Sequence, residues 1–297
     1  MPRHPPILGR RLRSYGRLPP IAEPQTEIRA LTWNLFHGRD WPPEPELQVR
    51  AHKGSWRRGP RRGRDYEQVN WDLFDRFAAM ICGERWDVAL FQEFPPRWKR
   101  RLARACEAEA HRALSGRNWL QPLTSLIASW RPDLLGAWEG GSNTTLVRRA
   151  AGPIAERRRV VLTRCPELRV MALTRLESGL CVANLHVSTK PSRAEAELLS
   201  AAERASEFAG TRPLIFGGDF NVRPRESDVF GRLEQRFALA PPTAPERLSH
   251  LLVRGLEVTE RPAAWLPEAR DVIDPDTGLR IRLSDHNPVF AGFAGVG

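Results

Sequence analysis

Short apolar segments that end in polar residues recur along this chain, and they constrain its fold more than any other feature. Alternating apolar and polar residues, or short runs rich in Val and Leu, predict strands, and helical spacing predicts helices between several of them. The expected strands cover residues 28–34, 87–93, 143–148, 158–163, 169–176, 180–186, 213–217, 248–253 and 288–293. The expected helices begin at residue 66 or cover 97–114, 193–209 and 227–237. Strands in runs with helices between them, without strict alternation, are typical of an α+β layered domain.

Two segments lack this periodicity. Residues 1–26 are rich in Pro and Arg, which predicts a flexible basic arm outside the fold. Residues 38–64 hold seven arginines among prolines and glycines, and they are expected to form a long basic loop. Residues 27–297 are then expected to form one domain that includes this loop.

The charge of the chain is strongly positive. A formal net charge of +11 and a pI near 10.7 draw anions to the surface, and nucleic acid is the leading candidate. The alternative is a composition rich in Arg, Ala and Pro that has raised the arginine count generally. With 41% hydrophobic residues the chain has enough apolar material for a sizeable core, which excludes a disordered protein.

The cysteines and the N-terminus bear on the compartment. Cys82, Cys106, Cys165 and Cys181 are widely spaced without a C-x-x-C pair, and we expect free thiols, mostly in the core. The basic residues near the N-terminus are not followed by the apolar run of a signal peptide, and no run approaches transmembrane length. The expected location is therefore cytoplasmic, and the sequence does not indicate an oligomeric state.

Five short polar segments stand at the ends of predicted strands. Each alone is a weak signal, because an Asn there is usually a turn former and a lone His is usually a core or surface residue. In chain order they are Trp33-Asn34, Gln92-Glu93, Asn184-Leu185-His186, Gly217-Gly218-Asp219-Phe220-Asn221 and Ser284-Asp285-His286-Asn287-Pro288. Their joint occurrence in this order resembles the endonuclease/exonuclease/phosphatase superfamily, whose fold is that of the pancreatic-type DNase. The resemblance implies a four-layered α/β/β/α sandwich with two packed mixed β-sheets and a site where strand ends converge.

The residue types in these segments suit the hydrolysis of a phosphodiester. Such a bond is anionic and has a poor leaving group, so hydrolysis needs a cation, a group that prepares water, and donors for the phosphoryl oxygens. Carboxylate and amide oxygens are the ligands that Mg²⁺ prefers, with Mn²⁺ as a substitute. We expect Glu93, Asn34 and Asp285 to bind the metal.

The catalytic residues are expected among the remaining members of the five segments. The strand period of two directs Asp219 and Asn221 to one face. By resemblance, Asp219 orients or deprotonates the attacking water and Asn221 steadies the phosphate or the acid. His186 and His286 resemble the two histidines that flank the scissile phosphate in the DNase and phosphatase branches.

Substrate contacts are expected from amides and from the basic loop. Asn184 shares the face of His186, although a structural strand residue explains it equally well, and Asn143 follows a glycine pair that a turn also explains. Arginines of the basic loop are predicted to contact backbone phosphates, and a solvated loop is the alternative. The arginines that carry this prediction are Arg57, Arg58 and Arg61.

Two departures from the family pattern bear on mechanism and subclass. Ser249 stands where family members commonly have an Asp that accepts a hydrogen bond from the histidine equivalent to His286. Either His286 is then less basic, or another acid such as Asp271 or Asp274 replaces the missing carboxylate. The abasic-site endonucleases of the family carry a tyrosine at the position of His186, which argues against that activity here.

Three functions follow from this pattern. We favour a nuclease that cleaves DNA or RNA by Mg²⁺-assisted in-line attack of water. The alternative is a phosphatase or phosphodiesterase on a small or lipid-borne phosphate, such as an inositol phosphate or a sphingomyelin-type head group. The third is a catalytically inactive binding module that has kept the fold, which the complete set of polar segments disfavours.

Overall fold

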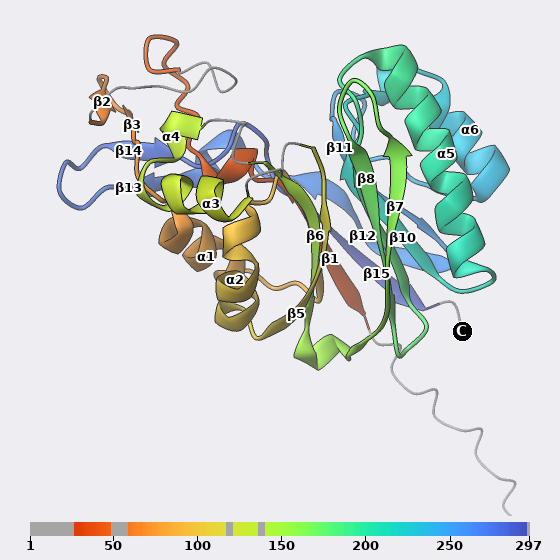
Figure 1. Cartoon of the computed structure of the whole chain (residues 1–297). Helices are drawn as coiled ribbons and strands as arrows, with labels where there is room; N and C mark the ends of the chain where they lie inside the picture. Colours follow the sequence, from red (N-terminus) through yellow and green to blue (C-terminus); the bar gives the residue numbers. More distant parts are fainter. Residues whose placement is uncertain (1–26, 49–58, 117–120, 136–139, 296–297) are drawn as a thin grey trace, which may run out of the picture.

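The computed structural model of the protein describes residues 27–48, 59–116, 121–135 and 140–295. Two β-sheets pack face to face, and helices cover the outer face of each (Figure 1). This arrangement confirms the expected four-layered sandwich. The expected basic arm at 1–26, and Arg57 and Arg58 of the basic loop, lie outside the described residues.

The first sheet has six strands in the order β12-β15-β1-β4-β6-β5. β1 and β4 are parallel and the other neighbours are antiparallel, so the sheet is mixed. Helices α1 (Phe74–Gly83) and α2 (Lys99–Ala105) pack on its outer face. The strands are β12 (Leu256–Ala264), β15 (Val289–Gly295), β1 (Ile28–Asn34), β4 (Val88–Gln92), β6 (Ser142–Arg148) and β5 (Ala108–Leu114).

The second sheet has five strands in the order β11-β10-β9-β8-β7. β9 and β10 are its parallel pair, and helices α5 (Pro191–Ala209) and α6 (Val229–Phe237) cover its outer face (Figure 1). The strands are β11 (Ser249–Arg254), β10 (Leu214–Asp219), β9 (Cys181–His186), β8 (Arg169–Leu176) and β7 (Ile154–Thr163).

Three apolar layers hold the sandwich together. Small and branched side chains such as Val88, Leu90 and Ile215 fill the space between the sheets. Larger rings, including Trp33 and Phe216, lie on the outer faces under the helices. Each such fully buried side chain contributes about 1.5–3 kcal/mol, so both sheets are fixed between two apolar layers.

The parallel pairs bring polar strand ends to the same edge of the sandwich. Asn34 pairs with Gln92 at the end of β1 and β4, and His186 pairs with Asp219 at the end of β9 and β10. Because parallel strands share a direction, their carboxyl ends meet at one sheet edge. Four of the five polar segments, all of which were expected to converge, thus end at this edge.

The structure differs from the sequence predictions in two regions, between residues 60 and 142 and between residues 256 and 282. The helix expected from residue 66 begins only at Phe74, because Glu67–Gln68 form the short strand β3, which pairs with β2 (Arg61–Arg62). The helix expected over 97–114 ends at Ala105, since Glu107 has a positive φ and the alternating residues that follow form β5 against β6. The sequence prediction also missed α3 (Gln121–Trp130), α4 (Pro132–Leu135), β12, β13 (Asp271–Ile273) and β14 (Arg280–Arg282).

The expectation of four free thiols is wrong for two of the cysteines. Cys82 in α1 and Cys106 after α2 form a disulfide with a Cα–Cα distance of 4.9 Å, whereas Cys165 is exposed and free and Cys181 is buried and free. α1 and α2 pack together over the first sheet, a proximity that wide spacing in the sequence does not reveal. Among the described residues, no helix is both long and apolar enough to cross a membrane.

Candidate active site

The polar strand ends of both sheets meet across the gap between them. The Nδ2 of Asn34, the last residue of β1, donates a hydrogen bond of 2.9 Å to Oδ2 of Asp219, the last residue of β10. Nε2 of His186 lies 3.5 Å from the same carboxylate oxygen, and Nε2 of His286 lies 3.7 Å from it. The structure therefore brings three of the predicted site residues around the buried carboxylate of a fourth, Asp219.

Two further carboxylates adjoin this group. Glu93 follows β4, and its Oε1 lies 3.9 Å from Nδ1 of His186. Asp285 lies beside His286, with Oδ1 3.8 Å from the imidazole Nε2. All seven residues predicted for catalysis and metal binding, with Asn221 directly after β10, thus lie on the loops and strand ends of one edge.

The backbone at this edge is held in an unusual conformation. Of the seven non-glycine residues with positive φ in the described ranges, five belong to the loops of this site. A left-handed conformation at such a residue costs about 1–3 kcal/mol and persists only where surrounding contacts impose it. Such residues cluster at functional sites, which supports this edge as the active site. The five are Phe36, His37, Glu93, Asn221 and Ser284.

Hydrogen bonds fix the loop that carries Asp285 and His286. The Ser284 hydroxyl donates to the backbone oxygen of Asn34 at 2.7 Å and accepts from the His286 N–H at 3.1 Å. The indole N–H of Trp33 donates to the His286 carbonyl at 2.8 Å. The buried guanidinium of Arg270 donates to the carbonyls of Leu283 and Ser284. The last two residues of β1 thereby set the position of the His286 loop.

Asp219 and His286 form a charge pair. Burial alone would raise the pKa of Asp219, but His286, His186 and the hydrogen bond from Asn34 hold it below its usual range. Burial likewise opposes the charge of His286, but the carboxylates of Asp219, Asp285 and Glu93 together raise the pKa of this imidazole above 6.5. The surroundings therefore favour the ionised form of Asp219 and the protonated form of His286.

His186 is in the opposite state. Burial and the nearby charge of Arg169 lower its pKa to about 3, so it is neutral at physiological pH. Arg169, the first residue of β8, is largely buried and donates to Glu167 at 2.8 Å. Nothing in the sequence distinguished Arg169 from the many other arginines, and only the fold shows its charge next to His186 and Glu93.

The acidic side of the site fits a hard divalent cation. Burial and neighbouring carboxylates raise the pKa of both Glu93 and Asp285, although His286 opposes this rise in each. Mg²⁺ commonly uses one or two protein carboxylates, with water and substrate completing its shell. In the part of the chain that the structure describes, no group of three or more His, Cys, Asp or Glu side chains is arranged to hold a metal alone. The donors present therefore fit a cation that is shared with water and substrate, with Asn34 as the adjoining amide.

The predicted substrate-binding amides are engaged within the protein. Asn184 accepts a hydrogen bond from Gln92 at 2.8 Å and donates to the Phe91 carbonyl at 3.2 Å, which connects the two sheets. Asn143 donates to the Val170 carbonyl at 2.7 Å across the same gap. Contact of either residue with substrate stays a prediction, and the structure shows both as links between the sheets.

Other predicted side chains lie farther out or have other partners. Arg61 lies in the β2–β3 hairpin, which Figure 1 places at the far left of the molecule beside β13 and β14. Asp271 binds Arg282 at 2.7 Å, and Asp274 accepts backbone N–H groups of its own turn. Neither Asp271 nor Asp274 is the acid next to His286, because Asp219 and Asp285 occupy that place. Ser249 pairs with Asp219 in the β10–β11 ladder.

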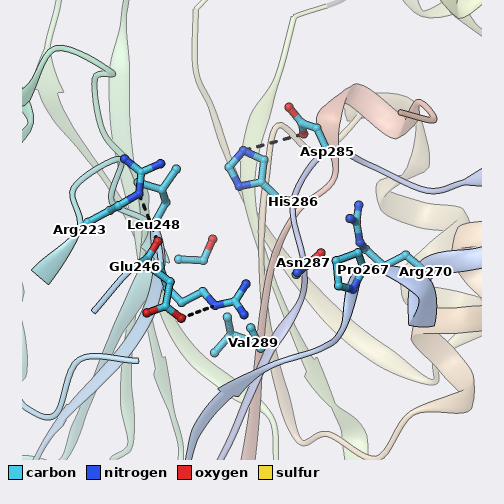
Figure 2. Close-up of a pocket in the computed structure, with 12 residues that line it drawn as sticks. Arg223, Glu246, Leu248, Pro267, Arg270, Asp285, His286, Asn287 and Val289 are labelled. Carbon is cyan, nitrogen blue, oxygen red and sulfur yellow. Dashed lines mark hydrogen bonds and ion pairs between the residues drawn. The ribbon is translucent and has the colours of Figure 1, made fainter. Parts of the chain in front are cut away.

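A cleft of about 350 Å³ opens beside His286. Figure 2 shows Arg223 and Glu246 on one wall, Arg270 on the other, and Asp285 and His286 at the end of the cleft. The Nε of Arg270 is buried without a hydrogen-bond partner, and burial lowers its pKa to about 10. The cleft therefore places the arginines Arg223, Arg247 and Arg270 near His286.

One site residue that the sequence analysis missed is His37. Its Nε2 lies 3.2 Å from Oε2 of Glu93, and its Nδ1 lies 3.0 Å from the Gly140 carbonyl oxygen. It stands three residues after Asn34, just before the expected basic loop at 38–64. The turn Phe36–Gly38 places it at the site, and no strand-end pattern marked it.

A sequence profile of the Endonuclease/Exonuclease/phosphatase family matches residues 31–286, and the chain belongs to this family. Members of the family are typically hydrolases that act on phosphoesters. No curated protein matches the sequence significantly.

Solved structures of the same fold cover nearly the whole chain. An endonuclease/exonuclease/phosphatase family protein from Bacteroides thetaiotaomicron has a TM-score of 0.61 at 15% identity, over 93% of this chain and 100% of that one. A mannosyl-6-phosphatase from the same organism has a TM-score of 0.58 at 15% identity, over 90% and 99% of the two chains. TDP2 from Caenorhabditis elegans has a TM-score of 0.53 at 13% identity, over 91% and 75%. At these identities the likeness shows the fold alone.

Proposed function

We propose that this protein is a metal-dependent phosphodiester hydrolase that cleaves DNA or RNA. The observation that carries the proposal is the ionised Asp219 carboxylate, which has one imidazole at 3.5 Å and a second at 3.7 Å. A base flanked by two such groups, beside a pair of carboxylates, is the arrangement that phosphoester hydrolysis requires.

Each residue has a distinct task in this mechanism. Asp219 orients the attacking water and removes its proton, and Asn34 holds the carboxylate in place through its 2.9 Å hydrogen bond. The protonated His286 donates to a phosphoryl oxygen or to the leaving group. His186 is neutral and donates a hydrogen bond without adding charge.

The acidic residues provide for a cofactor. Glu93 and Asp285 would hold a divalent cation, Mg²⁺ or Mn²⁺, which neutralises charge on the phosphoryl oxygens when bound. Arg169 supplies a positive charge near His186 and Glu93. Together, the cation and Arg169 favour the binding of an anionic phosphate in a region that itself carries three carboxylates.

The basic charge supports nucleic acid as the substrate. The net charge of +11 attracts polyanions, and the cleft beside His286 is lined by Arg223, Arg247 and Arg270. A polynucleotide has phosphates on both sides of the scissile bond, so these arginines have a second phosphate to contact.

A small phosphorylated molecule is the second candidate. The fold neighbour named as a mannosyl-6-phosphatase is a phosphatase on the same architecture, and the cleft of about 350 Å³ has room for a sugar-sized group. Specificity within a shared fold depends on such loops.

A substrate screen separates these functions. Purified protein with Mg²⁺ or Mn²⁺ is incubated with plasmid DNA, RNA, inositol phosphates, sugar phosphates and sphingomyelin, with the Asp219→Asn variant as a matched control. Cleavage of polynucleotide by the wild-type protein alone is expected. Turnover of only the small phosphates would replace the nuclease proposal with the phosphatase, and no turnover of any substrate would indicate a binding module.

A further inference from the structure

We propose that His37 is a nitrogen ligand of the divalent cation that Glu93 binds, and that this ligand favours a transition ion such as Mn²⁺ over Mg²⁺. The inference rests on the metal dependence in the proposed function, and it adds a residue outside the five polar segments. Its basis is the geometry of one imidazole, one carboxylate and the turn that holds them together.

The orientation of the imidazole is set by a backbone carbonyl. Nδ1 of His37 lies 3.0 Å from the Gly140 oxygen, and a carbonyl oxygen only accepts hydrogen bonds. Nδ1 therefore carries the hydrogen. When the ring is neutral, Nε2 then carries a lone pair. This nitrogen lies 3.2 Å from Oε2 of the Glu93 carboxylate.

Two electron-pair donors that face each other are held together either by a shared proton or by a metal cation, and we propose the metal. Ligand atoms about 2.1 Å from an octahedral ion, at right angles to each other, lie about 3.0 Å apart. The 3.2 Å distance between Nε2 of His37 and Oε2 of Glu93 matches two neighbouring positions in such a shell. The carbonyl on Nδ1 fixes the ring orientation in the way that partners of metal-binding histidines do.

The backbone holds this pair together from two sides. Phe36, His37 and Gly38 are three consecutive residues with positive φ, and the His37 N–H donates to the Glu93 carbonyl at 3.1 Å. A Cβ at Gly141 would lie 3.4 Å from the His37 ring and 3.6 Å from the Glu93 Cα. The strained turn holds the imidazole close to the carboxylate, as a ligand position requires, and even a Cβ at Gly141 would make only ordinary contacts with the pair.

The chemistry of the donor gives the metal preference. Mg²⁺ prefers oxygen ligands, whereas imidazole suits first-row transition ions. A site with Glu93 and Asp285 alone would bind either ion through oxygen. The imidazole of His37 adds affinity for Mn²⁺ that Mg²⁺ does not share.

Pulsed EPR of bound Mn²⁺ tests this ligand directly. The full chain is loaded with one equivalent of Mn²⁺ without substrate, and electron spin-echo modulation reports nitrogen bound to the ion. The test variant is His37→Asn, because Asn tolerates a left-handed backbone better than other side chains. The matched control is His186→Gln, which removes the other imidazole within 3.9 Å of Glu93.

The wild-type protein and His186→Gln are expected to show nitrogen modulation, and His37→Asn to lose it. The Mn²⁺ dissociation constant should rise about 10-fold or more in His37→Asn, with a change of less than about threefold for Mg²⁺. Incorporation of ¹⁵N-histidine into the unchanged chain should alter the modulation, so the test does not depend on the variant folding.

The proposal is overturned if His37→Asn keeps the nitrogen modulation, or if its Mn²⁺ and Mg²⁺ affinities fall equally. Equal losses would mean that His37 only positions Glu93. These measurements need no substrate, so they test the ligand separately from the activity. If the protein bound Mn²⁺ through His37 but cleaved no polynucleotide, the proposed function would be contradicted and the role of His37 as a ligand would stand.

Discussion

The disulfide between Cys82 and Cys106 should contribute measurably to stability. It links the end of α1 to the residue after α2, and it closes a loop with a sequence separation of 24. For a loop of that length the chain-entropy relation gives about 3.4 kcal/mol of stabilisation. The entropy of unfolding of a domain this size is about 0.55 kcal/mol per kelvin, so loss of the disulfide should lower Tm by about 6 °C.

The measurement is thermal unfolding followed by circular dichroism, with and without a reducing agent. Reduction should lower the Tm of the wild-type protein by about 6 °C, as estimated from the loop length. The Cys82→Ser/Cys106→Ser variant should start at the lower Tm and not respond to reductant. Cys165 and Cys181 are free in both proteins, so reduction changes only the one bond.

A thiol count on unfolded protein gives an independent check. Two titratable thiols are expected without reductant and four after reduction. Four thiols before reduction, or a wild-type Tm that is the same in both conditions, would refute the reasoning. Because disulfides persist mainly in oxidising compartments, the result also bears on the expected cytoplasmic location.

Three further predictions concern the active site. Asp219→Asn should lower kcat on bis-para-nitrophenyl phosphate by about 10²–10⁴-fold at an unchanged fold, and an activity within tenfold of wild type would mean that another group prepares the water. His286 has a raised pKa and is proposed to act in its protonated form, so activity should decline as pH rises through a value above 6.5; His286→Gln should abolish this decline, and a profile unchanged in the variant would assign the titration elsewhere. Arg223→Gln combined with Arg247→Gln should weaken binding to arbitrary DNA and reduce the salt slope by about two, whereas an unchanged slope would exclude the cleft as the path of the polynucleotide.

The strand ends could be predicted because a polar residue after an alternating segment marks them. β1 ends at Asn34 as expected, and β10 ends at Asp219, two residues beyond the expected end at 217, since backbone alternation and burial act locally. β5 was mistaken for a helix because AEAHRAL is rich in good helix formers, and pairing with β6 overrides this local preference.

The partners of each side chain could not be predicted, since they depend on how distant segments pack. His37 meets Glu93 only because the Phe36–Gly38 turn has left-handed geometry, and Arg169 reaches the site from another sheet. The disulfide likewise depends on the contact between α1 and α2. Sequence spacing contains no record of these proximities.

The active site depends on the packing of one sheet against the other. Asn34 and Glu93 come from the first sheet, whereas His186 and Asp219 come from the second. Besides the Asn34–Asp219 contact, a buried hydrogen bond of 2.8 Å from Gln92 to Asn184 joins the sheets one or two residues below the site. Apolar packing between the sheets permits small shifts of one sheet against the other. A shift that broke the hydrogen bond between Gln92 and Asn184 would leave buried polar groups unsatisfied, at a cost of about 1–3 kcal/mol. This penalty keeps the sheets in register, so Asp219, the proposed general base, and Glu93, the proposed metal ligand, stay at a fixed separation.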